Sequence, residues 1–143
     1  MHWFPQKALH GFHGTLVDES GRVETKDFIS DYRLWFQMQA PGLNPDSTGI
    51  GWNDHGAAEY KLPEELHPTA WTGEMACEMI HNHKKGNRQP LFLKVSFARP
   101  HSPYDPPQRL SDLYIMRFLC SFSLGGKLTD FDVSFSQIGR AHV

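Results

Sequence analysis

The sequence predicts an α/β protein, because two amphipathic helical segments are followed by a short apolar strand and then by an irregular loop. The first helical pattern covers residues 26–39, the second covers residues 68–85, and the strand pattern covers residues 91–97. In open α/β sheets, ligands bind beyond the carboxyl ends of the strands. We therefore expect a functional site in the loop that follows residue 97.

Residues 26–39 read KDFISDYRLWFQMQ and fit an amphipathic helix, because the larger side chains recur every three or four positions. Thr25 is the predicted N-cap, and Pro41-Gly42 is the predicted stop. The residues that share the predicted helical face are Phe28, Tyr32, Trp35, Phe36 and Gln39.

Residues 41–67 are rich in Gly, Pro, Asn and Asp, which predicts a long irregular loop of the kind that is often functional. The second helix follows at once, since Pro68 suits the first helical position and Gly86 suits the position just past the end. Within this helix, Trp71 and Met75 are predicted core residues.

Residues 91–97, LFLKVSF, are dense in Leu, Val and Phe and are bounded by prolines, so they predict a buried strand. His101 lies four residues past the end of that strand. Pro100 and Pro103 flank it and restrict the backbone around it, so the imidazole should be held in place. From spacing alone, a catalytic and a structural role for this histidine are equally good interpretations.

The composition is typical of one soluble globular domain, with 143 residues, 39% hydrophobic and 21% charged. The net charge of −2 argues against a nucleic-acid partner, which would call for a basic chain. The sequence has no apolar run long enough to span a membrane. Cys77 and Cys120 have neither metal-binding nor redox spacing.

A family resemblance lies in residues 92–107, which read F-L-K-V-S-F-x-R-P-H-x-P-Y-D-P-P. They resemble the strand and loop of type I, formylglycine-dependent sulfatases in the alkaline phosphatase superfamily. Met1-His2 followed by an aromatic residue resembles the end of the family motif G-K-x-H. Residues 3–36, WFPQKALHGFHGTLVDESGRVETKDFISDYRLWF, are similar to arylsulfatases and choline sulfatases. The resemblance covers residues 1–114 and implies a fragment of a mixed-sheet sandwich domain.

The resemblance implies a sulfuric ester hydrolase that acts on a small-molecule sulfate ester. In that family a formylglycine, made from the first residue of C/S-x-P-x-R, attacks sulfur, and a divalent cation, usually Ca²⁺, polarises the sulfate oxygens. Fixed positive charge suits this chemistry, because negative charge spreads over several oxygens. A histidine protonates the leaving alcohol, since an alkoxide is a poor leaving group and imidazole titrates near neutral pH.

Carried over to this chain, the resemblance assigns two catalytic residues. His101 matches the leaving-group histidine, and His2 matches the histidine of G-K-x-H that contacts the sulfate or the nucleophile. Lys94, Arg99 and His67 are candidates for binding the substrate. Each of these three also has an ordinary structural explanation, as a strand lysine, a solvated arginine and a residue that caps the second helix.

Other family motifs do not match. The chain contains no C/S-x-P-x-R, the lysine of G-K-x-H is missing, and nothing after His101 matches the metal motif S-D-N/H-G. Asn53-Asp54-His55-Gly56 reads like that motif but precedes the strand instead of following it, so we expect it to form part of a loop. We therefore expect no metal ligands in this chain, with Ca²⁺ and formylglycine confined to the intact parent enzyme.

Residues 115–143 depart from the resemblance and have no clear period. The last six residues, IGRAHV, are the translation of ATC-GGA-AGA-GCA-CAC-GTC, a widely used sequencing-adapter string. Our hypothesis is a partial catalytic domain over residues 1–114, followed by an unrelated tail from a frameshift or adapter. Because one strand and two helices cannot cover both faces of a buried strand, the chain alone should fold poorly and be inactive.

Two alternatives stay open at this point. A phosphonate monoester or phosphodiester hydrolase of the same superfamily would share the fold and the charge stabilisation. A non-catalytic fragment would instead use residues 98–107 to bind a partner or an anion. The particular ester, the compartment and the oligomeric state do not follow from the sequence.

Overall fold

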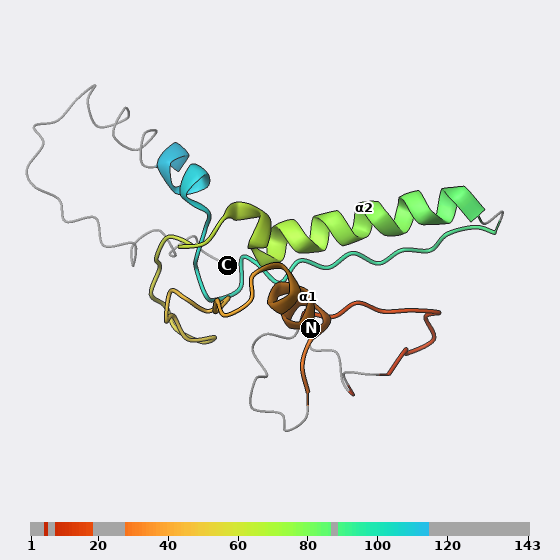
Figure 1. The fold of residues 1–143 in the computed structure, drawn as a ribbon, viewed down its shortest axis with the longest axis horizontal. Helices are drawn as coiled ribbons and strands as arrows, with labels where there is room; N and C mark the ends of the chain where they lie inside the picture. Colours follow the sequence, from red (N-terminus) through yellow and green to blue (C-terminus); the bar gives the residue numbers. More distant parts are fainter. Residues whose placement is uncertain (1–4, 6–7, 19–27, 87–88, 115–143) are drawn as a thin grey trace, which may run out of the picture. The chain divides into compact units, whose positions relative to one another are not determined.

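The computed structural model describes residues 5, 8–18, 28–86 and 89–114. Its helices are α1 (Asp31–Gln39), the short 3₁₀ helix η2 (Glu64–Leu66) and α2 (Pro68–Gly86), as shown in Figure 1. Residues 108–114 are also helical. The chain separates into two compact units. The first contains the described residues up to Pro45 and Glu65–Ala98, and the second contains Asp46–Glu64 and the chain from Arg99 onward.

α1 confirms the first predicted helix but begins later than the pattern indicated. Residues 28–30 are not helical, and Ser30 has the extended backbone of an N-cap. Its Oγ accepts a hydrogen bond from the Arg33 N–H at 3.3 Å, which satisfies a backbone donor that the first turn leaves open. The predicted N-cap at Thr25 is therefore wrong, because a serine closer to the aromatic face performs that role.

Replacing Ser30 by Ala is expected to lower the free energy of unfolding by about 1 kcal/mol, because the Arg33 N–H would lose its acceptor. Urea unfolding followed by tryptophan fluorescence measures the change. Ser47→Ala is the matched control, since Ser47 is an exposed serine outside the helices. Equal unfolding midpoints for the Ser30 and Ser47 variants would contradict the cap.

The core of the first unit is aromatic and joins α1 to α2. Tyr32, Phe36 and Trp71 are 1%, 0% and 3% exposed, which confirms these three predicted positions. The rest of the prediction holds less well, because Gln39 is exposed, Phe28 precedes the helix and Met75 is only half-buried. The Tyr32 ring centroid lies 6.0 Å from that of Phe36 and 5.5 Å from that of Trp71, at edge-to-face or tilted angles that aromatic pairs prefer. The Tyr32 hydroxyl donates to the Leu66 carbonyl at 2.8 Å, so the polar end of this buried ring is also satisfied.

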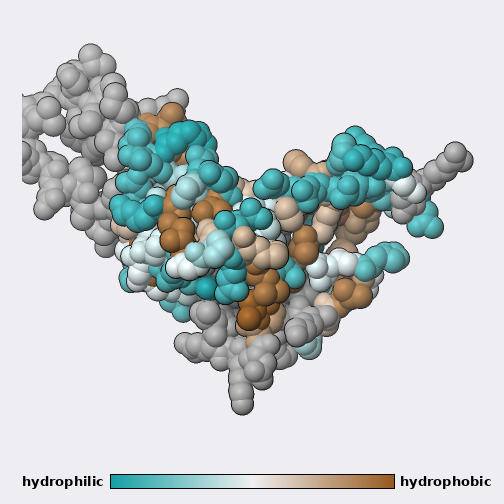
Figure 2. Space-filling model, in the orientation of Figure 1, coloured by the Kyte–Doolittle hydropathy of each residue, from teal (hydrophilic) through white to brown (hydrophobic). Residues whose placement is uncertain are grey.

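α2 confirms the second predicted helix to within one residue. Pro68 occupies its first position, where a missing N–H costs nothing. His83, Lys84 and Lys85 lie in the last turn, where positive charge interacts well with the helix dipole. Hydrophilic side chains gather over this end of the helix in Figure 2. In the part of the chain that the structure describes, no helix has the length and apolar character needed to cross a membrane.

The predicted buried strand at residues 91–97 is wrong for the described structure, which contains no β-strand. The segment runs back alongside α2 in an extended path (Figure 1). Most of its apolar side chains are exposed, with Phe92 78% and Phe97 49% accessible. The reason is physical: a strand is buried by neighbouring strands on its edges and by layers on its faces, and the described residues supply no bridge partner to this segment. The described part is therefore helical and irregular, and it does not contain a sheet.

Candidate functional site

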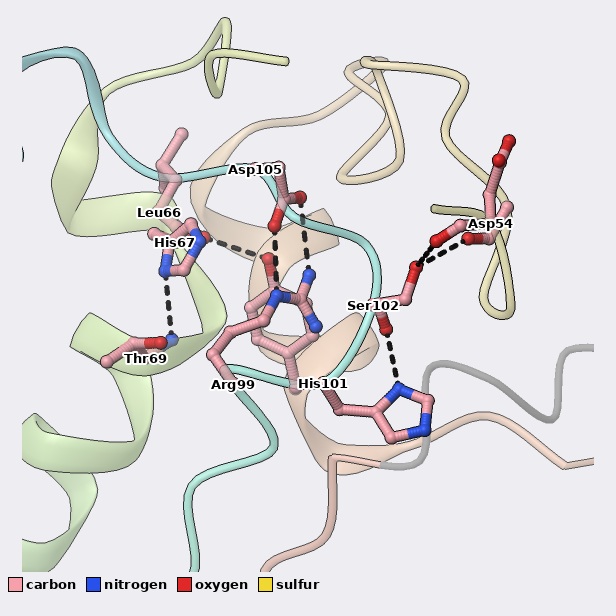
Figure 3. A network of polar contacts seen from close by, with 10 residues as sticks. Asp54, Leu66, His67, Thr69, Arg99, His101, Ser102 and Asp105 are labelled. Atoms are coloured by element: carbon pink, nitrogen blue, oxygen red, sulfur yellow. Dashed lines mark hydrogen bonds and ion pairs between the residues drawn. The ribbon is translucent and has the colours of Figure 1, made fainter. Parts of the chain in front are cut away.

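The loop that carries His101 belongs to the second unit and is built from residues 99–107. The Arg99–Pro100 and Ser102–Pro103 peptide bonds are both cis. The imidazole of His101 is exposed, and its Nδ1 lies 3.0 Å from the Ser102 carbonyl oxygen (Figure 3). Because a carbonyl only accepts hydrogen bonds, Nδ1 must carry the hydrogen in this contact. Nε2 is then the nitrogen that can take up or release a proton.

An ion pair between Arg99 and Asp105 closes this loop on itself. Arg99 Nε donates to one carboxylate oxygen at 2.9 Å, and Nη2 donates to the other at 3.2 Å. The two side chains are 16% and 2% exposed, so the pair is largely shielded from water. Two parallel charge-assisted bonds also fix the relative angle of the two groups. The backbone that presents His101 is therefore held at both of its ends.

Ser102, the residue after His101, fastens the loop to a distant part of the chain. Its buried hydroxyl lies 3.1 Å from the Gly51 carbonyl and 2.6 Å from the Asp54 carbonyl, and it donates its hydrogen between them (Figure 3). The Asp54 N–H in turn donates to the Gly51 carbonyl at 3.0 Å, so residues 51–54 form a tight turn. One hydroxyl thus binds both ends of this turn.

Isolated parallel bridges continue the same connection along the chain. They pair Ala57 with Tyr104 and Tyr60 with Pro107. The Ala58 N–H donates to the Tyr104 carbonyl at 3.0 Å, which satisfies backbone groups that would otherwise need water. The long loop expected between the two helices is therefore not loose over residues 51–60, because the proline-rich loop lies against it.

Arg109 adds a further link between the same two segments, beside an open groove lined by residues 59–64 and 107–109. Its Nε and Nη2 donate to the two carboxylate oxygens of Glu64 at 3.1 and 2.8 Å. That hydrogen bond, and then the charge of Glu64, raises the pKa of Arg109. A raised pKa favours the charged arginine at every pH below it, so the arginine stays charged across the ordinary pH range. The pair is exposed, and we expect salt to weaken it.

Trp52 covers the ring of His101. The two ring centroids lie 4.9 Å apart, and the ring planes meet at 25°, which is an offset stacked arrangement. Trp52 is the residue that follows Gly51 in the turn held by Ser102. The histidine is therefore supported from its own backbone on one side and by an aromatic face from a segment about fifty positions earlier in the sequence.

Replacing Ser102 by Ala is expected to lower the free energy of unfolding by about 1–3 kcal/mol, since the carbonyls of Gly51 and Asp54 would lose their shared donor. Amide hydrogen exchange at the Asp54 N–H, which closes the turn, measures the loss of protection locally. Ser96→Ala serves as the control, because Ser96 is an exposed serine. Unchanged protection of Asp54 in the Ser102 variant would contradict the proposed fastening.

The predicted site residues are distributed over both units. His101 and Arg99 lie in one loop of the second unit, whereas Lys94 and His67 belong to the first. Lys94 is exposed on the extended segment. His67 is buried, and its Nδ1 accepts from the Thr69 N–H at 3.2 Å, so it caps the start of α2 (Figure 3). His2 and residues 115–143 lie outside the described residues.

The described residues do not fit the calcium site that the sulfatase resemblance implies. Among them, no three His, Cys, Asp or Glu side chains gather closely enough to hold a metal ion. Asp54, the acidic residue of the sequence that imitates a metal motif, accepts the Gly56 N–H through Oδ1 at 3.3 Å. Hard cations such as Ca²⁺ require six to eight oxygen ligands, and a single turn carboxylate does not supply them.

Sequence reasoning missed three residues of this site, which are Trp52, Ser102 and Asp105. Asp105 had a signal, since it stands six positions from Arg99 with the opposite charge inside a proline-rich loop. Ser102 had a weaker one, as a small hydroxyl residue directly after the histidine. Trp52 had none, because nothing local in the sequence indicates that residues 51–54 return to the His101 loop.

Comparison with known proteins relates the chain to a sulfatase. No protein-family model matches the chain. An arylsulfatase of Clostridium perfringens (strain 13 / Type A) is 32% identical over 126 residues, which cover 80% of this chain and 26% of that protein. The chain therefore spans about a quarter of the length of the curated relative that it matches. Identity at this level over most of the chain supports a sulfatase-like relationship.

Proposed function

We propose that the chain is a segment of the catalytic domain of a sulfuric ester hydrolase, and that the activity belongs to a longer polypeptide. The proposal includes the α/β sandwich of formylglycine-dependent sulfatases, with Ca²⁺ and the nucleophile held by residues outside this chain. The relationship to an arylsulfatase supports it. The match includes 80% of the chain, so the relationship does not depend on one short motif.

The observation that carries the proposal is the geometry of His101. Its Nδ1 hydrogen is committed to the Ser102 carbonyl, and its ring is exposed. Among the described residues Nε2 makes no hydrogen bond, so it is available to a ligand. These are the requirements for a proton donor, which must keep one tautomer and present one nitrogen to the reacting group.

In the proposed reaction, protonated His101 donates from Nε2 to the ester oxygen of the leaving alcohol. As an oxygen nucleophile supplied from outside this chain forms a bond to sulfur, the bond between sulfur and the ester oxygen breaks. Its electron pair stays on that oxygen and the proton arrives there, so a neutral alcohol leaves while the sulfuryl group stays on the nucleophile. His101 becomes neutral and keeps its Nδ1 hydrogen on the Ser102 carbonyl. A proton donor in this position contributes about 10²–10⁴ to the rate.

The roles assigned to His2 and Lys94 by the resemblance stay predictions. His67 is buried and uses Nδ1 to cap the start of α2, which favours its structural role. Arg99 has fewer N–H groups available for a sulfate group, because Nε and Nη2 donate to Asp105. Its remaining Nη1 is buried and makes no hydrogen bond within the described residues.

The test is turnover by the protein expressed from its locus with the flanking coding sequence. 4-Nitrophenyl sulfate, bis(4-nitrophenyl) phosphate and 4-nitrophenyl phenylphosphonate share one leaving group, so their kcat/KM values compare attack at sulfur with attack at phosphorus. We expect the sulfate to be favoured by about tenfold or more, equal to 1.4 kcal/mol in transition-state binding. Preference for either phosphorus ester would identify the related hydrolase instead. Tight sulfate binding with no turnover of any ester would identify a binding protein.

A further inference from the structure

We propose that Trp52 is a positioning residue for His101, and that it fixes the plane of the imidazole and thereby the direction of Nε2. The catalytic meaning of this inference rests on the proposed function. The geometric part does not, because it concerns only how the chain holds one ring.

The turn at residues 51–54 is built to present Trp52 to this ring. The Ser102 hydroxyl contacts the carbonyls at both ends of the turn, at 3.1 Å for Gly51 and 2.6 Å for Asp54. Trp52 lies between those two anchored positions. Ser102 directly follows His101, so the indole and the imidazole are fixed from the same point of the loop. The stack at 4.9 Å is therefore a consequence of the backbone arrangement.

The hydrogen bond and the stack restrain different motions of His101. A histidine ring has a broad torsion about its second side-chain bond, so a loop that fixes the backbone leaves the ring direction open. The bond from Nδ1 to the Ser102 carbonyl restrains one edge of the ring. The face of Trp52, at 25° to the imidazole, restrains its tilt. With both in place, Nε2 has one direction.

The size of the effect follows from aromatic pairing. In addition to the effect of burying apolar area, such a pair shifts the equilibrium between stacked and unstacked ring orientations by about two- to twelvefold. Without Trp52, the ring should therefore leave the orientation that keeps Nδ1 on the Ser102 carbonyl in a substantial fraction of molecules. A tryptophan that merely fills space would not control the imidazole tautomer.

The first test reads the ring directly in the longer protein with its flanking coding sequence. Long-range ¹H–¹⁵N NMR of the histidine rings reports which nitrogen carries the hydrogen, and ring proton shifts report the stacked indole. We expect His101 to be the Nδ1–H tautomer with upfield-shifted ring protons. Trp52→Leu should abolish the shift and reduce the tautomer ratio by about two- to twelvefold. Trp52→Phe should retain most of the upfield shift and most of the tautomer ratio. Asn53→Ala, at the next position of the turn, should leave the shift and the ratio unchanged.

Exposed His55 provides the reference for an unrestrained ring in the same sample. The proposal is overturned if wild-type His101 has the tautomer ratio and ring proton shifts of His55, whether or not the rest of the chain is folded. It is also overturned if Trp52→Leu leaves the signals of His101 unchanged.

The second test measures the consequence in the longer protein with flanking coding sequence. Trp52→Leu should lower kcat for an alkyl sulfate by about two- to twelvefold with little change in KM, and Trp52→Phe should restore kcat. An unchanged kcat in Trp52→Leu would overturn the positioning role. If the wild-type protein hydrolyses no sulfate ester, the proposed function fails, while the NMR measurement still decides how Trp52 and His101 are arranged.

Discussion

Replacing His101 by Asn in the longer protein is expected to reduce kcat for an alkyl sulfate by about 10²–10⁴-fold. The loss should be much smaller for 4-nitrophenyl sulfate, because nitrophenolate is stable without a proton. This difference separates a missing proton donor from a general loss of structure, which would slow both substrates alike. The expectation depends on the exposed Nε2 of His101 and on the committed hydrogen at Nδ1.

The measurement is a pair of kcat values, one for each leaving group, in the wild type and the variant. His55→Asn is the matched control, since His55 is an exposed histidine of the same unit. It should leave both rates unchanged. If His101→Asn slowed the alkyl and nitrophenyl esters by the same factor, the role of proton donor would be wrong.

Replacing Asp105 by Ala is expected to lower the free energy of unfolding of the second unit by about 3–5 kcal/mol. The Arg99 side chain is only 16% exposed, and the substitution would leave its charge without the carboxylate that pairs with it. The Nη1 of Arg99 already lacks a hydrogen bond in the described structure, so no spare acceptor is at hand. Urea unfolding followed by the Trp52 indole signal measures the loss.

Two further variants make this prediction specific. The double variant Arg99→Met and Asp105→Leu should recover much of the stability, because it removes both charges and keeps apolar volume. Asp112→Ala changes an exposed carboxylate in the same unit and should have little effect. If Asp105→Ala and Asp112→Ala unfolded at the same urea concentration, the buried pair would not be holding the loop.

The helices could be predicted because their signals are local. Trp71 and the aromatic face of α1 followed from a spacing of three to four residues, and the bounds of α2 followed from Pro68 and Gly86. The start of α1 was misplaced because Thr25 and Ser30 are both acceptable caps by residue type. Only the position of the ring cluster of Tyr32, Phe36 and Trp71 distinguishes them, and that depends on tertiary packing.

The segment at residues 91–97 shows the opposite case. Its composition fits a buried strand, but burial depends on partners that no local pattern can supply, and Phe92 lies 78% exposed in the structure. The candidate site is similar. His101 can be predicted from its flanking prolines and its family resemblance. The stacking of Trp52 and the hydrogen bonds from Ser102 to residues 51–54 instead join positions about fifty residues apart in the sequence.

The most direct measurement is the sequence of the transcript and genomic DNA on both sides of this reading frame. The proposed function predicts an in-frame C/S-x-P-x-R motif upstream of His2, and a D-N/H-G metal motif downstream once the frame beyond residue 114 is corrected. That result would place His101 inside a complete sulfatase. A frame that starts at Met1, runs through Val143 and carries neither motif would contradict the catalytic interpretation of this chain.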